Sequence, residues 1–288
     1  MVEFSIRMEA FTTLDISDFS FFRCFLNELV DLFGEKRMSI LDVLSPKEAY
    51  SDKAIPLSSC SNKKLETIYS EGGAVLHDND GQFFTQLNWI KHKGPDARRF
   101  VRAMGYKQNN IYFGANETSM SQNSFQMKIL TLCDRVTEIF SVNYLCTYDL
   151  EYDKQGYGTK LELGAGLKNI YWLNIFGLPY IEILGREKLL SSPAYEVNGL
   201  GANHIRLLAT PTYNSFKGKR RNELRAHIRD HFGEAYFTKK KSACHEGPNA
   251  GGLFTLLRIM RRSHKEFNDT SWYADIRPEF DYSQILKI

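Results

Sequence analysis

Cysteine is scarce and scattered in this sequence. The chain has 5 cysteines among 288 residues, an odd number without the dense spacing of a disulfide framework. Its first residues, MVEFSIRMEAF, include Glu3, Arg7 and Glu9 and lack the basic start and apolar run of a secretory signal peptide. Reduced thiols and the missing signal together predict a cytoplasmic protein.

Long hydrophobic runs are also missing. One of the longest apolar stretches, LNIFGLPYIEIL at 173–184, contains Asn174 and Glu182. It is much shorter than the roughly 20 apolar residues that cross a bilayer. The sequence therefore predicts that the protein has no membrane partner.

The signatures of common enzyme classes are absent as well. There is no P-loop, and the glycine pairs at 156/158 and 164/166 do not complete a G-x-G-x-x-G motif between a strand and a helix. The sequence has no G-x-S-x-G elbow, no H-E-x-x-H helix and no C-x-x-C pair. We predict no catalytic residue, no cofactor and no metal ion, so the chain is expected not to be an enzyme.

Histidines suggest a weak metal-site alternative. His227 and His231 are spaced to lie one turn apart on a predicted helix, with Cys244 and His245 downstream. The arginine and lysine side chains on the same helix would repel a cation. Solvated or capping roles are therefore favoured for these histidines.

A carboxylate-based enzyme is a further alternative. Asp149, Glu151 and Asp153 alternate along a predicted strand, which places them on one face as in some metal-dependent nucleases. A solvated strand end explains the same pattern. An enzyme with a pocket lined by these carboxylates or by His204 is therefore kept as a hypothesis, after the two binding hypotheses given below.

The overall composition, 43% hydrophobic and 25% charged, is that of a globular protein. Alternating apolar residues predict strands at 2–11, 38–44, 82–90, 110–116, 143–150 and 204–210, and helical spacing predicts helices at 18–33, 61–72, 122–140, 217–232 and 253–267. The segment 171–197 is expected to combine strand-like and short helical pieces. We predict an α+β fold with mixed or antiparallel sheets and packed helices. The halves 1–108 and 109–288 form two domains or one continuous domain, and two related strand–helix–strand halves are an open alternative.

Basic residues concentrate in the C-terminal half. Residues 151–288 hold 21 Lys and Arg against 15 Asp and Glu, whereas residues 1–150 hold 16 against 19. The helical spacing of the basic residues predicts two basic stripes, one on helix 217–232 and one on helix 253–267. Their members are Lys217, Arg221, Arg225, Arg229, Arg258, Arg261, Arg262 and Lys265, and all of these except Lys217 are taken as candidate binding residues. Such stripes bind nucleic-acid phosphates or acidic proteins, or they are merely solvated.

One segment and the residues after it resemble a known family. The stretch YWLNIFGLPYIEILGREKLLSSPAYEV at 171–197 is followed by GEAYF at 233–237 and PEFDYS at 278–283. These blocks resemble the immunity proteins of bacterial polymorphic-toxin and type VI secretion systems. The matching residues of the first block are Trp172, Asn174, Phe176, Gly177, Pro179 and Tyr180. The region at about 238–270 departs from the family pattern.

The resemblance implies a protein that neutralises a cognate bacterial toxin by stoichiometric binding. Such a protein is expected to bind a protein toxin or effector, either through its mildly acidic N-terminal half or at an acidic site of the toxin. The alternative is a nucleic-acid-binding protein that acts through the basic helices 217–232 and 253–267.

Overall fold

A computed structural model of the chain describes residues 4–12, 14, 16–41, 54–89, 109–149, 167, 169–233 and 236–237. The described residues divide into two units. Unit 1 holds those of Met1–His92, Gln108–Gln155 and Thr212–Asn214, and unit 2 holds those of Gly156–Pro211 and Ser215–Ile288. Each unit contains antiparallel strands and helices, which confirms the predicted α+β fold. The division into domains at residue 108 stays a prediction.

Unit 1 is built on an antiparallel sheet. Its strands are β1 (Ile6–Thr12), β2 (Met38–Leu41), β3 (Ala54–Pro56), β4 (Gly73–Asp78), β5 (Phe83–Asn88), β6 (Asn109–Ala115) and β7 (Tyr144–Asp149). Their order across the sheet is β3-β2-β4-β5-β6-β1-β7, and each neighbouring pair is antiparallel. The N-terminal strand β1 is thus central, between two strands that lie more than a hundred residues further along the chain.

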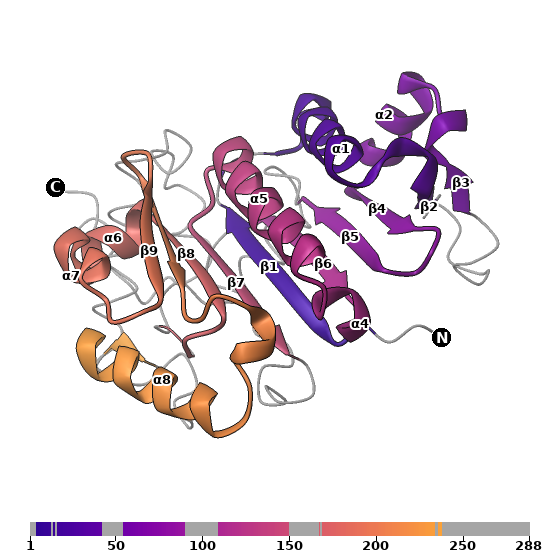
Figure 1. The fold of residues 1–288 in the computed structure, drawn as a ribbon. Coiled ribbons are helices and arrows are strands. Elements are labelled where there is room, and N and C mark those ends of the chain that lie inside the picture. The colour runs from indigo at the N-terminus through magenta and orange to yellow at the C-terminus, as the bar shows by residue number, and fades with distance from the viewer. Residues whose placement is uncertain are drawn as a thin grey trace, which may run out of the picture. The chain divides into compact units, whose positions relative to one another are not determined.

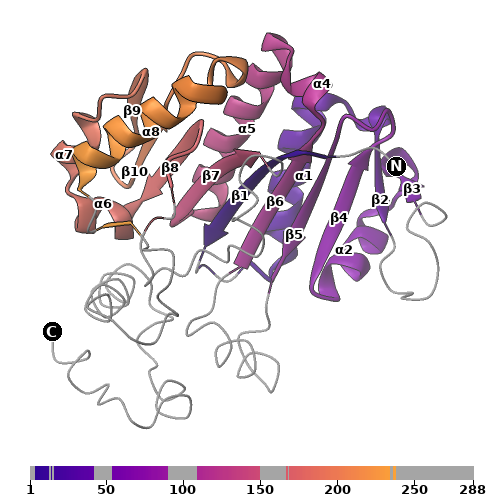
Figure 2. The same ribbon diagram turned by 90° about the horizontal axis from the view of Figure 1, so that it is seen from below.

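The helices of unit 1 pack on one face of this sheet (Figures 1 and 2). They are α1 (Phe19–Phe33), α2 (Asn62–Ser70), α4 (Glu117–Met120) and α5 (Asn123–Phe140), with short 3-10 turns η1 (Glu35–Arg37) and η3 (Leu57–Ser59). Asp18 caps α1 by accepting from the Ser20 amide, and Ser61 caps α2 by accepting from the Lys64 amide. Both helices therefore begin where their capping residues predict.

Aromatic side chains fill the core between these helices and the sheet. Phe33 of α1 packs on Phe83 with ring centroids 4.4 Å apart, and Phe83 stacks on Phe113 at 5.0 Å. Phe22 stacks on Tyr69 of α2 at 5.0 Å. Such pairs contribute about 0.5–1.5 kcal/mol each beyond their buried area, so they join helix α1 firmly to the sheet.

One residue predicted for the core lies at the surface. The spacing of α5 assigns Met127 to the same apolar side as Leu130 and Cys133, yet Met127 is 61% exposed. Leu130 and Cys133 are buried as predicted, and Cys133 contacts Met8 of β1. The apolar stripe of α5 is narrower than the spacing of Met127, Leu130, Cys133, Val136 and Phe140 suggests, because Met127 lies outside the contact with the sheet.

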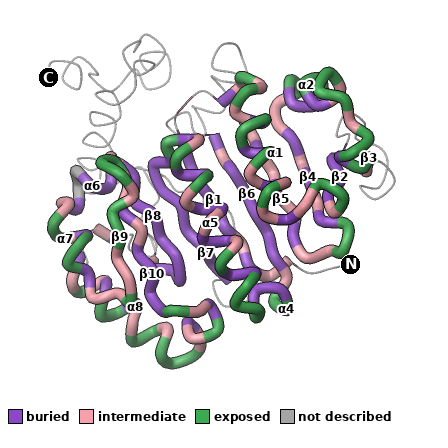
Figure 3. Tube along the Cα trace, turned by 45° about the horizontal axis from the view of Figure 1, so that its top comes forward, coloured by how far each residue is buried: buried purple, intermediate pink, exposed green. Residues whose placement is uncertain are grey.

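Unit 2 contains a smaller antiparallel arrangement, in the order β8-β10-β9. Its strands are β8 (Leu173–Gly177), β9 (Glu196–Leu200) and β10 (His204–Leu208), and its helices are α6 (Leu178–Leu184), α7 (Arg186–Leu190) and α8 (Gly218–Phe232). A 3-10 turn, η5 (Tyr213–Ser215), precedes α8 along the chain, and its first two residues belong to unit 1. Figure 3 shows buried residues along the strands and exposed residues on the outer sides of the helices.

Most predicted elements in the described ranges are confirmed, and three strands were missed. The strands β3, β4 and β9 were not predicted, because Pro56 in β3 and the glycines at 72, 73 and 199 read as loop signals. The predicted helix 253–267 and the PEFDYS block lie outside the described residues. In the part of the chain that the structure describes, no helix is long and apolar enough to span a membrane.

Candidate protein-binding surface

The two faces of the unit 1 sheet differ in what they carry. Ile6, Met8 and Ala10 of β1 are buried on the side of α5, whereas the alternating Arg7 and Glu9 point to the opposite face and are half-buried. Among the described residues, no helix packs on that second face, which we call the helix-free face. Polar and aromatic side chains therefore line the middle of the sheet on this face, and Tyr112, Cys146 and Tyr148 among them are buried.

Strand register aligns the side chains of the helix-free face in two rows. Residues paired directly across neighbouring antiparallel strands lie about 4.5–5.5 Å apart and contact one another. The first row runs from β4 to β7 through His77, Phe84, Gly114, Arg7 and Tyr148. The second row, in the same strand order, comprises Val75, Gln86, Tyr112, Glu9 and Cys146.

Arg7 is the centre of this surface. Its guanidinium carbon lies 4.8 Å from the ring centroid of Tyr112 and 5.6 Å from that of Phe84, within the range of a cation–π interaction. Its Nε donates to the Phe4 carbonyl at 3.2 Å. The side chain is thus held in place by two rings and a backbone oxygen.

Gly114 makes room for this packing. A Cβ at Gly114 would lie 2.3 Å from Cε1 of Phe84, closer than any real contact. The Phe84 ring therefore covers the Gly114 backbone, with its centroid 5.3 Å from that of Tyr112 and 4.8 Å from that of Phe4. The glycine at this cross-strand position is what allows the aromatic ring to lie flat beside Arg7.

Tyr148 and Glu9 form a second pair on the same face. Burial, and then the negative charge of Glu9, raises the pKa of the Tyr148 phenol well above its usual range, and a hydrogen bond to the Glu9 side chain contributes to the shift. The neutral phenol therefore donates to the carboxylate at every physiological pH. Glu9 is engaged with Tyr148, next to Arg7.

The basic residues predicted on α8 have mixed positions. Arg225 is buried at 8% exposure, donates from Nε to the Ile170 carbonyl at 2.7 Å and lies over the rings of Tyr171 and Phe216. Arg229 is half-buried with its guanidinium 4.2 Å from the Phe237 ring centroid, and Arg221 is half-buried too. This stripe packs towards the interior of unit 2, and the other predicted basic residues, Arg258, Arg261, Arg262 and Lys265, lie outside the described residues.

The outward side of α8 carries both charges. Lys219 and Arg220 are exposed together with Glu223 and Asp230, and Lys219 pairs with Glu223 at 3.5 Å. An exposed pair of this kind contributes little to stability. The described part of α8 therefore offers no uniformly basic surface.

Trp172 and Asn174, from the block that resembles immunity proteins, are core residues of unit 2. Trp172 is 1% exposed and donates from Nε1 to the Thr210 carbonyl at 3.1 Å. Asn174 is fully buried; its side chain donates to the Tyr171 carbonyl at 2.9 Å and accepts from the Tyr171 amide at 3.2 Å. Both side chains thus fix the entry of β8.

The next residues of that block shape the turn from β8 into α6. Gly177 precedes the helix as its capping residue, and Pro179 stands in the first turn, where a proline costs no hydrogen bond. Tyr180 is buried at 3%, with its ring 6.2 Å from Phe176, which in turn packs edge-on to Phe232 of α8. These residues therefore fix how β8, α6 and α8 pack together within unit 2.

Lys188 and His231 join α7 to the end of α8. The Lys188 ammonium donates to the Phe232 carbonyl at 2.6 Å, and a ring nitrogen of His231 lies 2.8 Å from the Lys188 carbonyl. A cation at the C-terminal carbonyls of a helix is favourable. His231 therefore has a structural contact, His227 on the same helix is exposed, and Cys244 and His245 lie outside the described residues.

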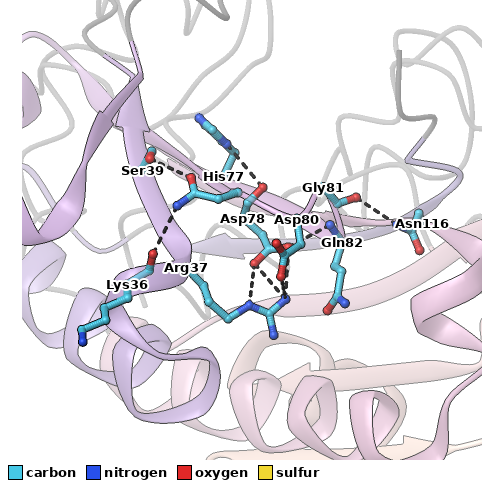
Figure 4. Close-up of polar contacts among 10 residues, drawn as sticks. Lys36, Arg37, Ser39, His77, Asp78, Asp80, Gly81, Gln82 and Asn116 are labelled. Carbon is cyan, nitrogen blue, oxygen red and sulfur yellow. Dashed lines mark hydrogen bonds and ion pairs between the residues drawn. The ribbon is translucent and has the colours of Figure 1, made fainter.

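An ion-pair cluster of unit 1 connects η1 with the turn between β4 and β5 (Figure 4). The side chain of Asp78 is fully buried and accepts from Nε and Nη2 of Arg37 at 3.2 and 3.3 Å, and from the Gln82 amide at 2.9 Å. Asp80, whose side chain is 65% exposed, lies 3.0 Å from the same guanidinium. These contacts satisfy the buried carboxylate, so the cluster braces the hairpin.

Of the three carboxylates predicted as an alternative catalytic site, the structure describes one, Asp149. Asp149 is buried and accepts from the Tyr213 hydroxyl at 2.6 Å, while Glu151 and Asp153 lie outside the described residues. His204 begins β10 and is half-buried. In the described ranges, no three His, Cys, Asp or Glu side chains gather closely enough to hold a metal ion.

Sequence reasoning did not single out Arg7, Phe84 or Tyr112. The available signal was the pair of charges in a strand whose other positions are apolar, which predicts a polar face for β1. The partner strands could not be predicted from it, because β1 pairs with β6, and β6 with β5, across separations of about 20 to 110 residues.

Comparisons with known proteins establish a shared fold. No family model matches this sequence, and no curated protein sequence matches it. Among solved structures, the chain is similar to the Pseudomonas aeruginosa type VI secretion system (T6SS) protein PA0821, with a TM-score of 0.52 and 10% identity over 92% of this chain and 85% of that chain. At this identity the likeness shows the fold alone.

Proposed function

We propose that the protein is a non-catalytic binding protein that neutralises a cognate bacterial toxin by stoichiometric binding, as immunity proteins do. The helix-free face carries the proposal, because it combines Arg7 with Phe84, Tyr112 and Gln86 in ordered rows. Arginine and aromatic residues are the types that dominate the binding energy of protein interfaces. The fold shared with a T6SS protein and the sequence blocks in unit 2 give further support.

Charge favours a protein partner for this face over a nucleic acid. Residues 1–150, which supply all five strands of the two rows, hold 19 Asp and Glu against 16 Lys and Arg. A mildly acidic region repels phosphates, whereas it attracts a basic protein and raises the association rate. Many nuclease toxins are basic, so this half of the chain suits them.

The nucleic-acid alternative would require basic residues of α8, or of the predicted helix 253–267 outside the described residues, to reach phosphates. Arg225 is buried against two aromatic rings, and the outward side of α8 mixes Lys219 and Arg220 with Glu223 and Asp230. A phosphate-binding surface gains affinity from each exposed cation and loses it from each exposed carboxylate. We therefore favour neutralisation by protein contact, which occludes the toxin sterically.

The decisive experiment starts from the tagged full-length protein in the lysate of the bacterium that encodes it. We expect one protein to be recovered in stoichiometric amount, with and without nuclease treatment, and identified by mass spectrometry. That protein should then stop the growth of a test bacterium when expressed alone and be harmless when co-expressed with this chain. Recovery of nucleic acid, loss of partners after nuclease treatment, or a partner that is not toxic would refute the proposal.

A further inference from the structure

Strand β9 is the last strand of the unit 2 arrangement. In the described ranges it pairs with β10 on one side and with no strand on the other. Asn198 and Gly199 of β9 are exposed, and the other three residues of the strand are half-buried. The N–H and C=O groups on the outer side of such an edge strand are available to pair with a further strand.

Strand β9 lacks the residues that often protect an edge strand from pairing. Its sequence, EVNGL, contains no proline and no lysine, which natural edge strands use to prevent the addition of another strand. Its one charged residue, Glu196, is paired with Arg206 at 2.7 Å and accepts from the Asn198 side-chain amide at 2.6 Å. This carboxylate is therefore neutralised within its own molecule and repels an approaching strand only weakly.

Exposed apolar side chains flank the same edge. Among the described residues, the large apolar side chains at the surface are those of Met127, Leu190 and Tyr195. Leu190, 42% exposed, ends α7, which lies beside β9 (Figure 1), and Tyr195, 60% exposed, immediately precedes β9. The edge thus offers apolar contacts next to backbone donors and acceptors, and these are the two components of binding by strand addition.

We infer that β9 pairs with β9 of a second copy of this chain, as two antiparallel strands related by a two-fold axis at Asn198. This register places Val197 opposite Gly199, and Glu196 opposite Leu200, of the other copy. Like charges directly opposite each other destabilise a strand pair, and this register has none. The strand is therefore complementary to itself in charge and in side-chain size, and this self-association goes beyond the neutralisation of a toxin.

The same register gives Tyr195 a contact on the other copy. In an antiparallel pair the beginning of one strand lies beside the end of the other, so Tyr195 comes close to the other copy's Gly199. The Arg186 guanidinium lies at this end, because an added Cβ at Gly199 would be 3.4 Å from its Nη2. A tyrosine ring packs favourably on a guanidinium and on glycine backbone, as Phe84 does on Gly114 in unit 1.

The small size of this contact sets the strength of the association. Two paired strands of 5 residues and their flanking side chains make a smaller interface than the roughly 1,200–2,000 Å² that stable complexes bury. The two copies also lose translational and rotational freedom when they associate. We therefore expect a weak dimer that forms in the micromolar range of concentration.

Analytical ultracentrifugation of the full chain over a range of concentrations measures this association. Asn198→Lys places two ammonium groups opposite each other at the two-fold axis, and Tyr195→Ser removes the exposed ring. The matched control is Asn27→Lys, which adds the same charge at an exposed residue of α1 in unit 1. Thermal melting checks that each variant is folded.

We expect the wild type and Asn27→Lys to form a dimer as the concentration rises. Asn198→Lys should weaken the dimer several-fold, because like charges then face each other across the strand pair. Tyr195→Ser should weaken it to a smaller degree. A wild type that stays monomeric at every concentration, or a dimer that Asn198→Lys leaves unchanged, overturns the inference.

Oxidative cross-linking tests the register, in a Cys24→Ser background because Cys24 is exposed. Asn198→Cys puts two thiols opposite each other across the two-fold axis, with Cα atoms about 4.5–5.5 Å apart, which is within disulfide range. Leu200→Cys puts the two thiols four residues apart along the strands, about 13 Å. We expect a disulfide-linked dimer on a non-reducing gel from the first variant alone. A cross-link in neither variant, or equally in both, overturns the pairing.

A strand of the toxin is the competing occupant of this edge. If the wild type is monomeric and Asn198→Lys loses affinity for the recovered toxin, the edge receives a partner's strand and the inference is overturned. A dimer that depends on Asn198 without any toxin present supports the inference. The growth assay decides the proposed function separately, so failure of the one is distinguishable from failure of the other.

Discussion

Asp78 shows how a single residue of unit 1 combines burial with charge. Its side chain is fully buried at the end of β4, yet it accepts two hydrogen bonds from Arg37 and one from the Gln82 amide. A buried carboxylate is tolerated only when such partners replace water. The residue is thus essential to the β4–β5 turn although the sequence around it, HDNDGQ, reads as an ordinary polar turn.

Replacing Asp78 by alanine should destabilise the protein by about 2 kcal/mol, since the Arg37 guanidinium and the Gln82 amide lose their acceptor while Arg37 can still turn to water. Urea denaturation followed by circular dichroism measures the change. Asp80→Ala is the matched control: its side chain is 65% exposed and contacts the same guanidinium at 3.0 Å, so its denaturation midpoint should barely move. Equal losses in the two variants would contradict this role of Asp78.

Tyr148 makes a pH-dependent contribution to stability. Because its folded pKa is raised above the ordinary value of 10.0 by burial and Glu9, the unfolded chain releases this proton at a lower pH than the folded chain does. The associated stability is fully present below pH 10.0 and is lost as the pH rises beyond it.

The Tyr148→Phe variant should therefore lose less stability than the wild type when the pH is raised above 10.0. The free energy of unfolding, measured by urea denaturation on both sides of that pH, gives the comparison. Tyr195→Phe, at a residue 60% exposed, is the control and should follow the wild type. A Tyr148→Phe curve that falls as steeply as the wild type would refute the account.

At the scale of elements, the pairing of β4 with β5 depends on a glycine. Gly73, the first residue of β4, has φ of 145°, and a Cβ there would lie 1.9 Å from the Leu87 carbonyl oxygen. No side chain fits without moving the β5 backbone. This strand was not predicted because Gly72 and Gly73 read as the end of helix α2 rather than the start of a strand.

Gly73→Ala should destabilise the protein by about 3 kcal/mol or more, because the strain is both steric and conformational. Gly201→Ala, at φ of 65° with nothing within 4 Å of the added Cβ, should cost only about 1–2 kcal/mol for the left-handed backbone. Thermal or urea unfolding of the two variants measures the difference. If Gly73→Ala is the milder change, the close approach of β4 to β5 is wrong.

For the whole molecule, we propose that the mildly acidic N-terminal part binds the partner and that helix α8 has a structural role. Reversing the exposed charges of α8 by Lys219→Glu and Arg220→Glu together should leave toxin neutralisation unchanged, since these residues belong to unit 2 and not to the two rows of unit 1 that carry the proposal. Arg7→Glu should abolish neutralisation, because it reverses the charge at the centre of the two rows and removes the guanidinium from the Tyr112 and Phe84 rings. A co-expression growth assay compares the two, and loss of protection in the α8 variant would favour a role for the basic helix.

Local patterns in the sequence determined much of this protein. The α1 boundaries follow from the Asp18 cap and the spacing of its phenylalanines, and α8 ends at Gly233 as predicted. Antiparallel strands and an α+β fold follow from alternation and from the order of the elements. These features depend on residues that lie close together along the chain, so they can be predicted from the sequence alone.

Tertiary structure alone decided which aromatic rings lie against which arginines. Periodicity placed Arg225 on a basic stripe, but Tyr171 and Phe216 cover it from distant positions of the chain. In the sequence Arg7 is only a charged residue of a predicted strand. The registers of β1 with β6 and of β6 with β5 place Tyr112 and Phe84 against it. The spacing of residues along a helix or strand fixes which side chains share a face, whereas what lies opposite that face depends on long-range pairing, for which a single sequence contains no local signal.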